Sequence, residues 1–312
     1  MQSWQSKTFE KVIWMTKRRN KFVTEQSMAQ YIEKMKKRPP YVLSQRFMQK
    51  NNISMFTINE MDVYVLNQHS LDEECIVYFH GGAYINEITN FHWRYLQKLA
   101  AKTKKKIYVP IYPKLPFSNY SVCYDKLNHF FNKLVERNEQ FIFMGDSAGG
   151  GLALGFTQSL VYAEKKLPTQ LILFSPWLDL EGQDVRYYEL EPLDPMVAIK
   201  GAQVLAKLWL GDAPDVRNPL ISPLYSDIEQ LPPLTIIVGT NELILLDCRR
   251  FKERLDAANI HCDYYEFEKM NHVFPLFPIP EANTVWSIIL PKLAPTKERK
   301  RTRKNAFSNV LA

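Results

Sequence analysis

The feature that most constrains the fold is an alternation of short apolar runs with stretches of helical period. Each apolar run ends in Gly, Pro or a polar residue, and the runs are Cys75–Phe79, Ile107–Tyr112, Phe141–Met144, Leu171–Phe174, Thr235–Val238 and Tyr264–Phe267. Stretches with apolar residues three and four apart lie between and after them: Phe91–Lys102, Val122–Arg137, Gly150–Ala163, Asp247–Ala258 and Glu281–Leu293. Strands that alternate with helices predict βαβ units, and strands that are apolar throughout predict a mostly parallel sheet covered on both faces.

Three further segments complete the predicted organisation. Ile53–Leu66 alternates in the manner of a strand, residues 1–45 have the pattern of amphipathic helices, and residues 182–212 interrupt the rhythm with turns and a helix from about Val197 to Leu210. We expect the helical segments to form a cap over the carboxyl ends of the strands. The expected division is a cap segment 1–45, a first core part 46–181, a cap insertion 182–212, a second core part 213–295 and a tail 296–312.

Most of the net charge of +7 comes from the C-terminal tail. Residues 297–304 carry six basic side chains and one acidic one, so they contribute +5 and the rest of the chain +2. We expect the tail to be solvated and disordered, with weak binding of phosphate or anionic lipid as the less favoured alternative. Because no basic face with interleaved aromatic residues is found, we expect no nucleic-acid partner.

The cysteines and the apolar runs argue against a zinc protein, a disulfide-linked protein and a membrane-spanning protein. Four cysteines lack the paired spacing of a zinc site or a disulfide framework: Cys75, Cys123, Cys248 and Cys262. Their pattern favours a reducing, cytoplasmic location and no metal. No apolar run reaches the length of a membrane span, so we expect no stable membrane insertion.

A candidate nucleophile follows the apolar run Phe141–Met144. The sequence continues with Gly145-Asp-Ser-Ala-Gly149, and a helical pattern begins directly afterwards. The order of strand, G-x-S-x-G and helix is the context of a nucleophile elbow, in which a serine hydroxyl projects above the sheet. Ser147 is therefore the predicted nucleophile, although a glycine-rich turn with no catalytic role would leave the same motif.

A second glycine-rich turn, His80-Gly-Gly-Ala-Tyr84, directly follows the run Cys75–Phe79. Such a loop lets backbone N–H groups point at a substrate oxygen. Backbone N–H groups of Gly82 and Ala83 or Gly81, together with Ala148, are the predicted oxyanion-hole donors. We expect His80 to orient this loop rather than to take part in catalysis.

The predicted base and acid follow the last two strands. His272 comes after the final strand, where a hydrolase with the order serine, acid, histidine has its base. Two carboxylates follow the strand Thr235–Thr240, and Glu242 is better placed than Asp247. Asp247 stands where the next helical pattern begins, and we expect it to act as the N-cap of that helix.

These pieces together resemble the hormone-sensitive-lipase-like family of esterases. The resemblance rests on motifs that run from His80 to His272: HGGAY at 80–84, YPKLPF at 112–117, GDSAGG at 145–150, SPWLD at 175–179, DPM at 194–196, SPL at 222–224, LPPL at 231–234 and MNH at 270–272. It implies an α/β-hydrolase fold, with a mostly parallel eight-stranded sheet flanked by helices and a helical cap. It also implies hydrolysis of carboxylic esters without metal or cofactor.

The resemblance assigns the nucleophile to Ser147 and the base to His272, and the chain departs from the family at two points. Ala83 replaces a third glycine of the oxyanion loop, and Glu242 stands where the family usually has Asp. Tyr84 and Trp177 occupy motif positions near the family's pocket, so they are predicted to bind substrate, although core packing accounts for them equally well.

The predicted function is a serine carboxylesterase that hydrolyses short-chain esters through an acyl-enzyme, with Ser147, His272 and Glu242 as the triad. The alternative from another class is a non-catalytic protein that binds a small ligand on the same scaffold. An amidase or peptidase would share the triad and also stays open. The expected partner is a small-molecule ester, and a homodimer is possible.

Overall fold

An eight-stranded sheet forms the centre of the computed structural model, which describes residues 2–137 and 139–294. The strands are β1 (Ile53–Ile58), β2 (Met61–Leu66), β3 (Glu74–Phe79), β4 (Ile107–Pro110), β5 (Gln140–Asp146), β6 (Leu171–Phe174), β7 (Leu234–Asn241) and β8 (Cys262–Asn271). Their order in the sheet is β1-β2-β4-β3-β5-β6-β7-β8. β2 pairs antiparallel with β1 and β4, and the pairs from β4 through β8 are parallel. The predicted mostly parallel sheet is confirmed.

The alternating segment Ile53–Leu66 forms two strands rather than a continuous one. Asn59 and Glu60 separate β1 from β2, and both have positive φ angles, of 45° and 59°. Left-handed backbone at two central residues is what a tight antiparallel hairpin requires, because its twist then matches that of the strands. The alternating pattern continues through the turn, so it does not reveal the break.

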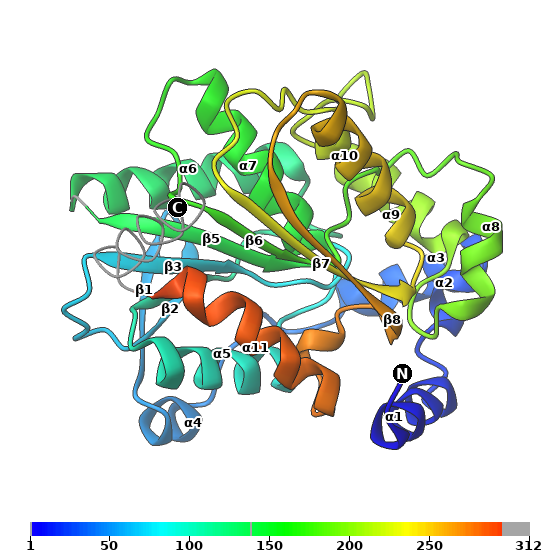
Figure 1. Cartoon of the computed structure of the whole chain (residues 1–312), viewed down its shortest axis with the longest axis horizontal. Helices are drawn as coiled ribbons and strands as arrows, with labels where there is room; N and C mark the ends of the chain where they lie inside the picture. Colours follow the sequence, from blue (N-terminus) through cyan, green and yellow to red (C-terminus); the bar gives the residue numbers. More distant parts are fainter. Residues whose placement is uncertain (1, 138, 295–312) are drawn as a thin grey trace, which may run out of the picture.

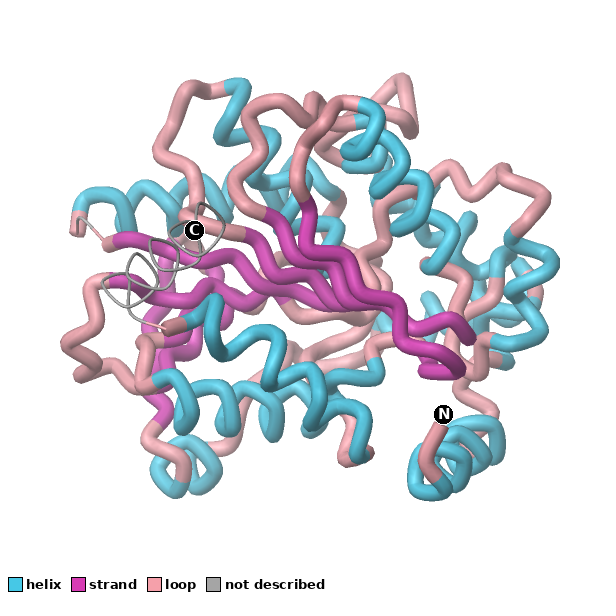
Figure 2. The backbone as a smooth tube through the Cα atoms, viewed as in Figure 1, coloured by secondary structure: helices cyan, strands magenta, loops and turns pink. Residues whose placement is uncertain are grey.

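Two layers of helices enclose the sheet (Figures 1 and 2). The helices are α1 (Trp4–Met15), α2 (Asn20–Val23), α3 (Glu25–Lys36), α4 (Gln45–Lys50), α5 (Asn90–Thr103), α6 (Tyr120–Glu136), α7 (Ala148–Tyr162), α8 (Tyr187–Leu190), α9 (Ile199–Leu210), α10 (Leu245–Ala257) and α11 (Pro280–Leu293). One apolar core lies under α6, α7 and α10, and a second lies under α5 and α11. Side chains of β3, β4 and β6 are buried throughout, which agrees with their apolar sequence apart from Glu74 at the start of β3.

The N-terminal helices separate into two groups. α2 and α3 pack on α9, near the end of the sheet where the carboxyl ends of β7 and β8 lie (Figure 1). α1 instead packs on α11. The predicted tail 296–312 lies outside the described residues. Among the helices of residues 2–137 and 139–294, none has both the length and the apolar character needed to cross a bilayer.

Candidate active site

Ser147 occupies a strained turn between β5 and α7. Its backbone has φ 52° and ψ −126°, a conformation that residues other than glycine rarely adopt. Three backbone hydrogen bonds hold it: the Ser147 N–H donates to the carbonyl of Phe174 at 2.9 Å, and the Ser147 carbonyl accepts from the N–H groups of Gly151 and Trp177, each at 3.0 Å. The turn directs the hydroxyl toward the carboxyl edge of the sheet.

The glycine at 149 follows from the close approach of two backbones. A Cβ at this position would lie 2.1 Å from the carbonyl oxygen of Phe79 and 2.5 Å from that of His80. Any side chain would therefore push α7 away from the end of β3. The motif residue is a packing requirement of the turn and has no chemistry of its own.

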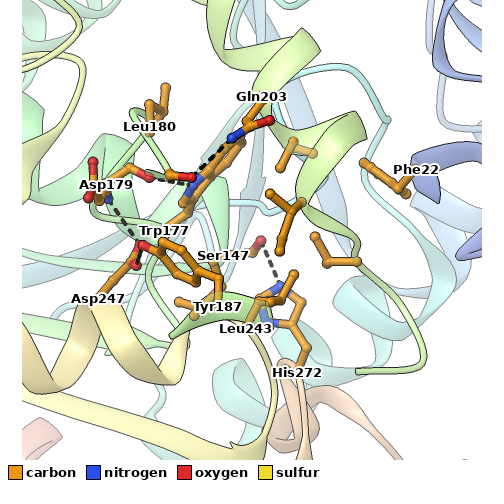
Figure 3. A pocket seen from close by; sticks show the side chains of 16 residues that line it. Phe22, Ser147, Trp177, Asp179, Leu180, Tyr187, Gln203, Leu243, Asp247 and His272 are labelled. Carbon is orange, nitrogen blue, oxygen red and sulfur yellow. Dashed lines mark hydrogen bonds between the residues drawn. The ribbon is translucent and has the colours of Figure 1, made fainter. Parts of the chain in front are cut away.

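Ser147, His272 and Glu242 form a continuous hydrogen-bonded chain (Figure 3 shows the first of its contacts). The Ser147 Oγ lies 2.9 Å from His272 Nε2, and His272 Nδ1 lies 2.5 Å from Glu242 Oε2. A carboxylate can only accept, so the imidazole proton lies on Nδ1, and Nε2 is left to accept the serine O–H. The three residues come from the ends of β5, β7 and β8.

The Glu242 carboxylate is fixed by partners other than His272. Its Oε1 accepts from the Gly239 N–H at 2.6 Å and from the Ser175 hydroxyl at 2.8 Å. Ser175 in turn accepts from the N–H of Val273, the residue after the histidine. These bonds aim the other oxygen, Oε2, at the imidazole.

Burial and charge set the protonation of this pair. Burial disfavours the imidazolium form of His272, but the charge and hydrogen bond of Glu242 outweigh it and raise the pKa of His272 above its ordinary value. Burial likewise raises the pKa of the Glu242 carboxyl, against the opposing effect of His272. The histidine is therefore a stronger base than an isolated imidazole.

Asp247 has a different role from the one predicted. The expectation that it caps α10 is wrong, because Ile244 occupies the N-cap position and Asp247 lies within the first turn. Its carboxylate accepts from the N–H groups of Leu178 and Asp179, each at 3.0 Å, and from the Tyr187 hydroxyl. Burial, followed by the nearby charge of Asp179, raises the pKa of Asp247 to about 7. Asp247 holds a loop in place and does not contact His272.

In the loop after β3, some backbone N–H groups donate to a protein acceptor and others do not. The Gly81 N–H donates to Asp146 Oδ1 at 3.0 Å, which removes it from the predicted oxyanion donors. Within the described residues, the N–H groups of Gly82, Ala83 and Ala148 donate to no protein acceptor. Gly82 has a φ of +134° and Ala83 a φ of +53°. Because the backbone turns here, the N–H groups of Gly82 and Ala83 do not follow that of Gly81 toward Asp146.

Sequence reasoning missed a buried network behind the turn. Asp146 Oδ1 accepts from the Tyr78 hydroxyl at 2.7 Å, and Oδ2 lies 3.2 Å from His92 Nε2. His92 Nδ1 accepts from the Thr89 N–H at 3.1 Å, so Nε2 carries the proton that binds Asp146. Burial disfavours the Asp146 carboxylate, but His92 and the other donors outweigh it and lower the Asp146 pKa. No motif spacing links Asp146 to His92, which lies in the first turn of α5, 54 residues earlier.

Ser147 and His272 line a cavity at the carboxyl edge of the sheet (Figure 3). Its other lining residues are Phe22, Ala83, Trp177, Asp179, Leu180, Gly182, Tyr187, Val197, Ile199, Ala202, Gln203, Leu243, Ile244 and Asp247. Trp177 is a wall residue, as its motif position predicts. Tyr84 is not a lining residue: it is buried behind the wall, with its ring centroid 5.8 Å from that of Trp177 and 4.1 Å from that of Trp209.

The sheet and the strand–serine–helix turn at its carboxyl edge define the class: an α/β hydrolase. A comparison with family models agrees, because the model described as alpha/beta hydrolase fold matches residues 76–276. In the part of the chain that the structure describes, no group of three or more His, Cys, Asp or Glu side chains could hold a metal ion.

Similar proteins and similar solved structures are described as esterases or as an acetyl-hydrolase. An esterase of Acinetobacter venetianus is 30% identical over 216 residues, which are 67% of this chain and 71% of that protein. An acetyl-hydrolase of Streptomyces hygroscopicus is 27% identical over 65% of this chain and 69% of its own length. The solved structure of an esterase from the bacterial hormone-sensitive lipase family superposes with a TM-score of 0.72 at 25% identity, covering 84% of this chain and 94% of that one.

The chain therefore belongs to the α/β-hydrolase family, in its hormone-sensitive-lipase-like branch, and is a carboxylic ester hydrolase. A Staphylococcus aureus protein proposed to be an esterase has the same architecture, with a TM-score of 0.81, 28% identity and coverage of 88% of this chain and 94% of that one.

Proposed function

We propose that the chain hydrolyses short-chain carboxylic esters through an acyl-enzyme formed on Ser147. His272 takes the proton of the serine hydroxyl as Oγ attacks the ester carbonyl, and then gives that proton to the departing alkoxide. Water enters by the same route, with His272 again as the base, and releases the acid. The observation that carries the proposal is the 2.9 Å contact between Ser147 Oγ and a histidine nitrogen that must accept.

Glu242 supports the histidine in both steps. Its carboxylate fixes the tautomer with the proton on Nδ1 and stabilises the imidazolium that forms when the serine proton moves. The N–H groups of Gly82, Ala83 and Ala148 are proposed to stabilise the negative oxygen of each tetrahedral intermediate. A donor of this kind contributes roughly 3 kcal/mol to lowering the barrier.

The cap is proposed to consist of α2 and α3 from the expected segment 1–45, without α1, which packs on α11, and of residues 182–212, and to select the substrate. Phe22 from α2 and Ile199, Ala202 and Gln203 from α9 line the same cavity as Ser147. A change in the packing of α2 on α9 would therefore alter the pocket without touching the triad.

The dependence of activity on pH is the first test of the base. His272 must be neutral to accept a proton, so kcat/KM for p-nitrophenyl acetate should fall as pH falls through the pKa of His272. Glu242 holds that pKa above 6.5, so the midpoint of the acidic limb should lie above this value. A constant kcat/KM down to pH 5 in protein that stays folded, as judged by circular dichroism, would contradict the role of His272.

The second test concerns the length of the acyl chain. The bulky side chains of Phe22, Trp177 and Tyr187 border the cavity and narrow the space beside Ser147. We expect kcat/KM for p-nitrophenyl esters to be highest for acetyl or butyryl groups and to fall by at least about tenfold for dodecanoyl esters, because longer chains cannot be buried at their full length. A preference for the dodecanoyl ester would refute this specificity.

A further inference from the structure

Helix α1 exposes an apolar face to solvent. Its inner face packs on the core, with Ile13 buried and the Phe9 ring 4.8 Å from that of Phe277. Its remaining large apolar side chains are exposed: Trp4 at 72%, Val12 at 49%, Trp14 at 39% and Met15 at 79%. The period of 3.6 residues places Trp4, Val12 and Met15 on one side of the helix. Exposed tryptophan at this density marks a surface with a partner.

Positive charge is interleaved with these apolar side chains, because the helical period places Lys7 and Lys11 between Trp14 and Trp4 on the same outer side. Residues 4–23 contain six basic side chains and one acidic one, Glu10, which accepts a hydrogen bond from Gln2. Arg19 pairs with Glu191. Four exposed bases form no ion pair with any carboxylate of the described residues: Lys7, Lys11, Lys17 and Arg18.

The charge extends from α1 toward the cap. The Lys21 Nζ lies 4.0 Å from the centre of the Tyr31 ring. Burial, followed by the positive charges of Arg18, Arg38 and Lys34, lowers the pKa of Lys21 to about 8. Cations from the turn between α1 and α2, from α2, and from α3 and the residues after it thus converge on one region, which favours an anionic partner.

We propose that the outer face of α1 and the basic run 17–21 bind the surface of an anionic lipid bilayer. Tryptophan and methionine would enter the boundary between headgroups and acyl chains, while the lysines and arginines contact lipid phosphates. α1 has 12 residues, which suits a helix lying in the plane of the interface. A symmetric contact with a second copy is disfavoured, because it would place this positive surface against itself.

This surface lies next to the active-site cavity. Phe22 follows Lys21 in α2 and lines the cavity, and α2 packs on α9. Figure 1 places α1 at the same end of the molecule as α2, α3 and α9. Binding to a bilayer would therefore bring the cavity close to the bilayer surface.

Vesicle co-sedimentation of the full chain tests the proposal. We expect binding to phosphatidylcholine vesicles that contain about one-third phosphatidylglycerol, and little binding to phosphatidylcholine alone, with release at high salt. Lys17→Glu with Arg18→Glu, and separately Trp4→Ser with Met15→Ser, should each lower the partition coefficient by at least about tenfold. Melting temperatures show whether the variants fold, independently of any esterase activity.

Matched controls use exposed residues elsewhere. Arg46→Glu with Lys50→Glu makes the same change of charge on α4, which Figure 1 shows well away from α1, and Leu71→Ser removes a side chain that is 99% exposed. These variants should bind as the unchanged chain does. Equal binding to both kinds of vesicle, or unchanged binding by the α1 variants, would overturn the proposal. So would absent vesicle binding together with dimers in light scattering that Trp4→Ser and Met15→Ser abolish, which would assign the face to a second copy.

Discussion

Replacing Ser147 by alanine is expected to lower kcat for p-nitrophenyl acetate by at least about four orders of magnitude. The substitution removes the atom that forms the acyl-enzyme, and His272 then has no hydroxyl within reach. The oxyanion donors and the pocket remain, so a small rate above that of the uncatalysed reaction should persist. The measurement is steady-state hydrolysis by purified protein, with the melting temperature recorded for each variant.

Ser159→Ala is the matched control for this substitution. Ser159 lies on the same helix, α7, and its hydroxyl donates to the carbonyl of Phe156, far along the helix from the turn. Its loss should leave kcat within about twofold, because it touches neither the cavity nor the triad. Activity of Ser147→Ala within about tenfold of the unchanged chain would rule out the proposed mechanism.

Glu242→Gln is expected to lower kcat by about three to four orders of magnitude. Glutamine keeps the shape of the side chain but removes the charge that stabilises the imidazolium. Its amide can also present a donor to His272 Nδ1, which would favour the tautomer with the proton on Nε2, and that nitrogen could not accept the serine proton. The same hydrolysis assay, repeated across pH, measures the effect.

Asp247→Asn is the control for the acid, because it makes the same kind of change at a second buried carboxyl, which lies five residues later in the chain, in the first turn of α10. Asp247 accepts from the backbone of Leu178 and Asp179 and does not contact His272, and the amide oxygen of asparagine can still accept those bonds. We expect kcat/KM within about tenfold. If Asp247→Asn loses most of its kcat/KM while Glu242→Gln stays active, the role of the triad acid must be reassigned to Asp247.

Much of the fold could be predicted because the sheet is buried on both faces. A strand such as β6, or β3 after its first residue Glu74, has no charged positions, so it stands out between amphipathic helices. The order of the functional residues along the chain could also be predicted, since each of them follows the end of a strand. Parallel strands bring these ends to one edge, which is why Ser147 and His272 meet although 125 residues separate them.

The features that the sequence could not predict depend on the direction in which individual N–H groups and side chains point. The Gly81 N–H turns toward Asp146 and so leaves the set of oxyanion donors, yet nothing in the motif distinguishes it from Gly82. Tyr84, at a positive φ of 57°, lies behind Trp177 instead of beside it and stacks on Trp209. His92 reaches Asp146 through the packing of α5 on the sheet, a tertiary contact with no local pattern.

The role of Asp247 shows the same limit. A carboxylate at the start of a helical pattern suggests a cap, because free N–H groups are available there. In this chain the helix begins two residues earlier, and the free N–H groups that Asp247 meets belong to the loop after β6. Tertiary contact therefore overrides the local preference.

The measurement that tests the central claim most directly is the site of covalent labelling by a fluorophosphonate, followed by peptide mass spectrometry. A phosphonyl group should be found on Ser147, with fluoride released and loss of activity in proportion to labelling, because the reagent reacts with a serine activated by a neighbouring histidine. Labelling should be absent in Ser147→Ala and much slower in Glu242→Gln. A label on another residue that tracks the loss of activity, or ester hydrolysis that continues with Ser147 fully labelled, would contradict the account.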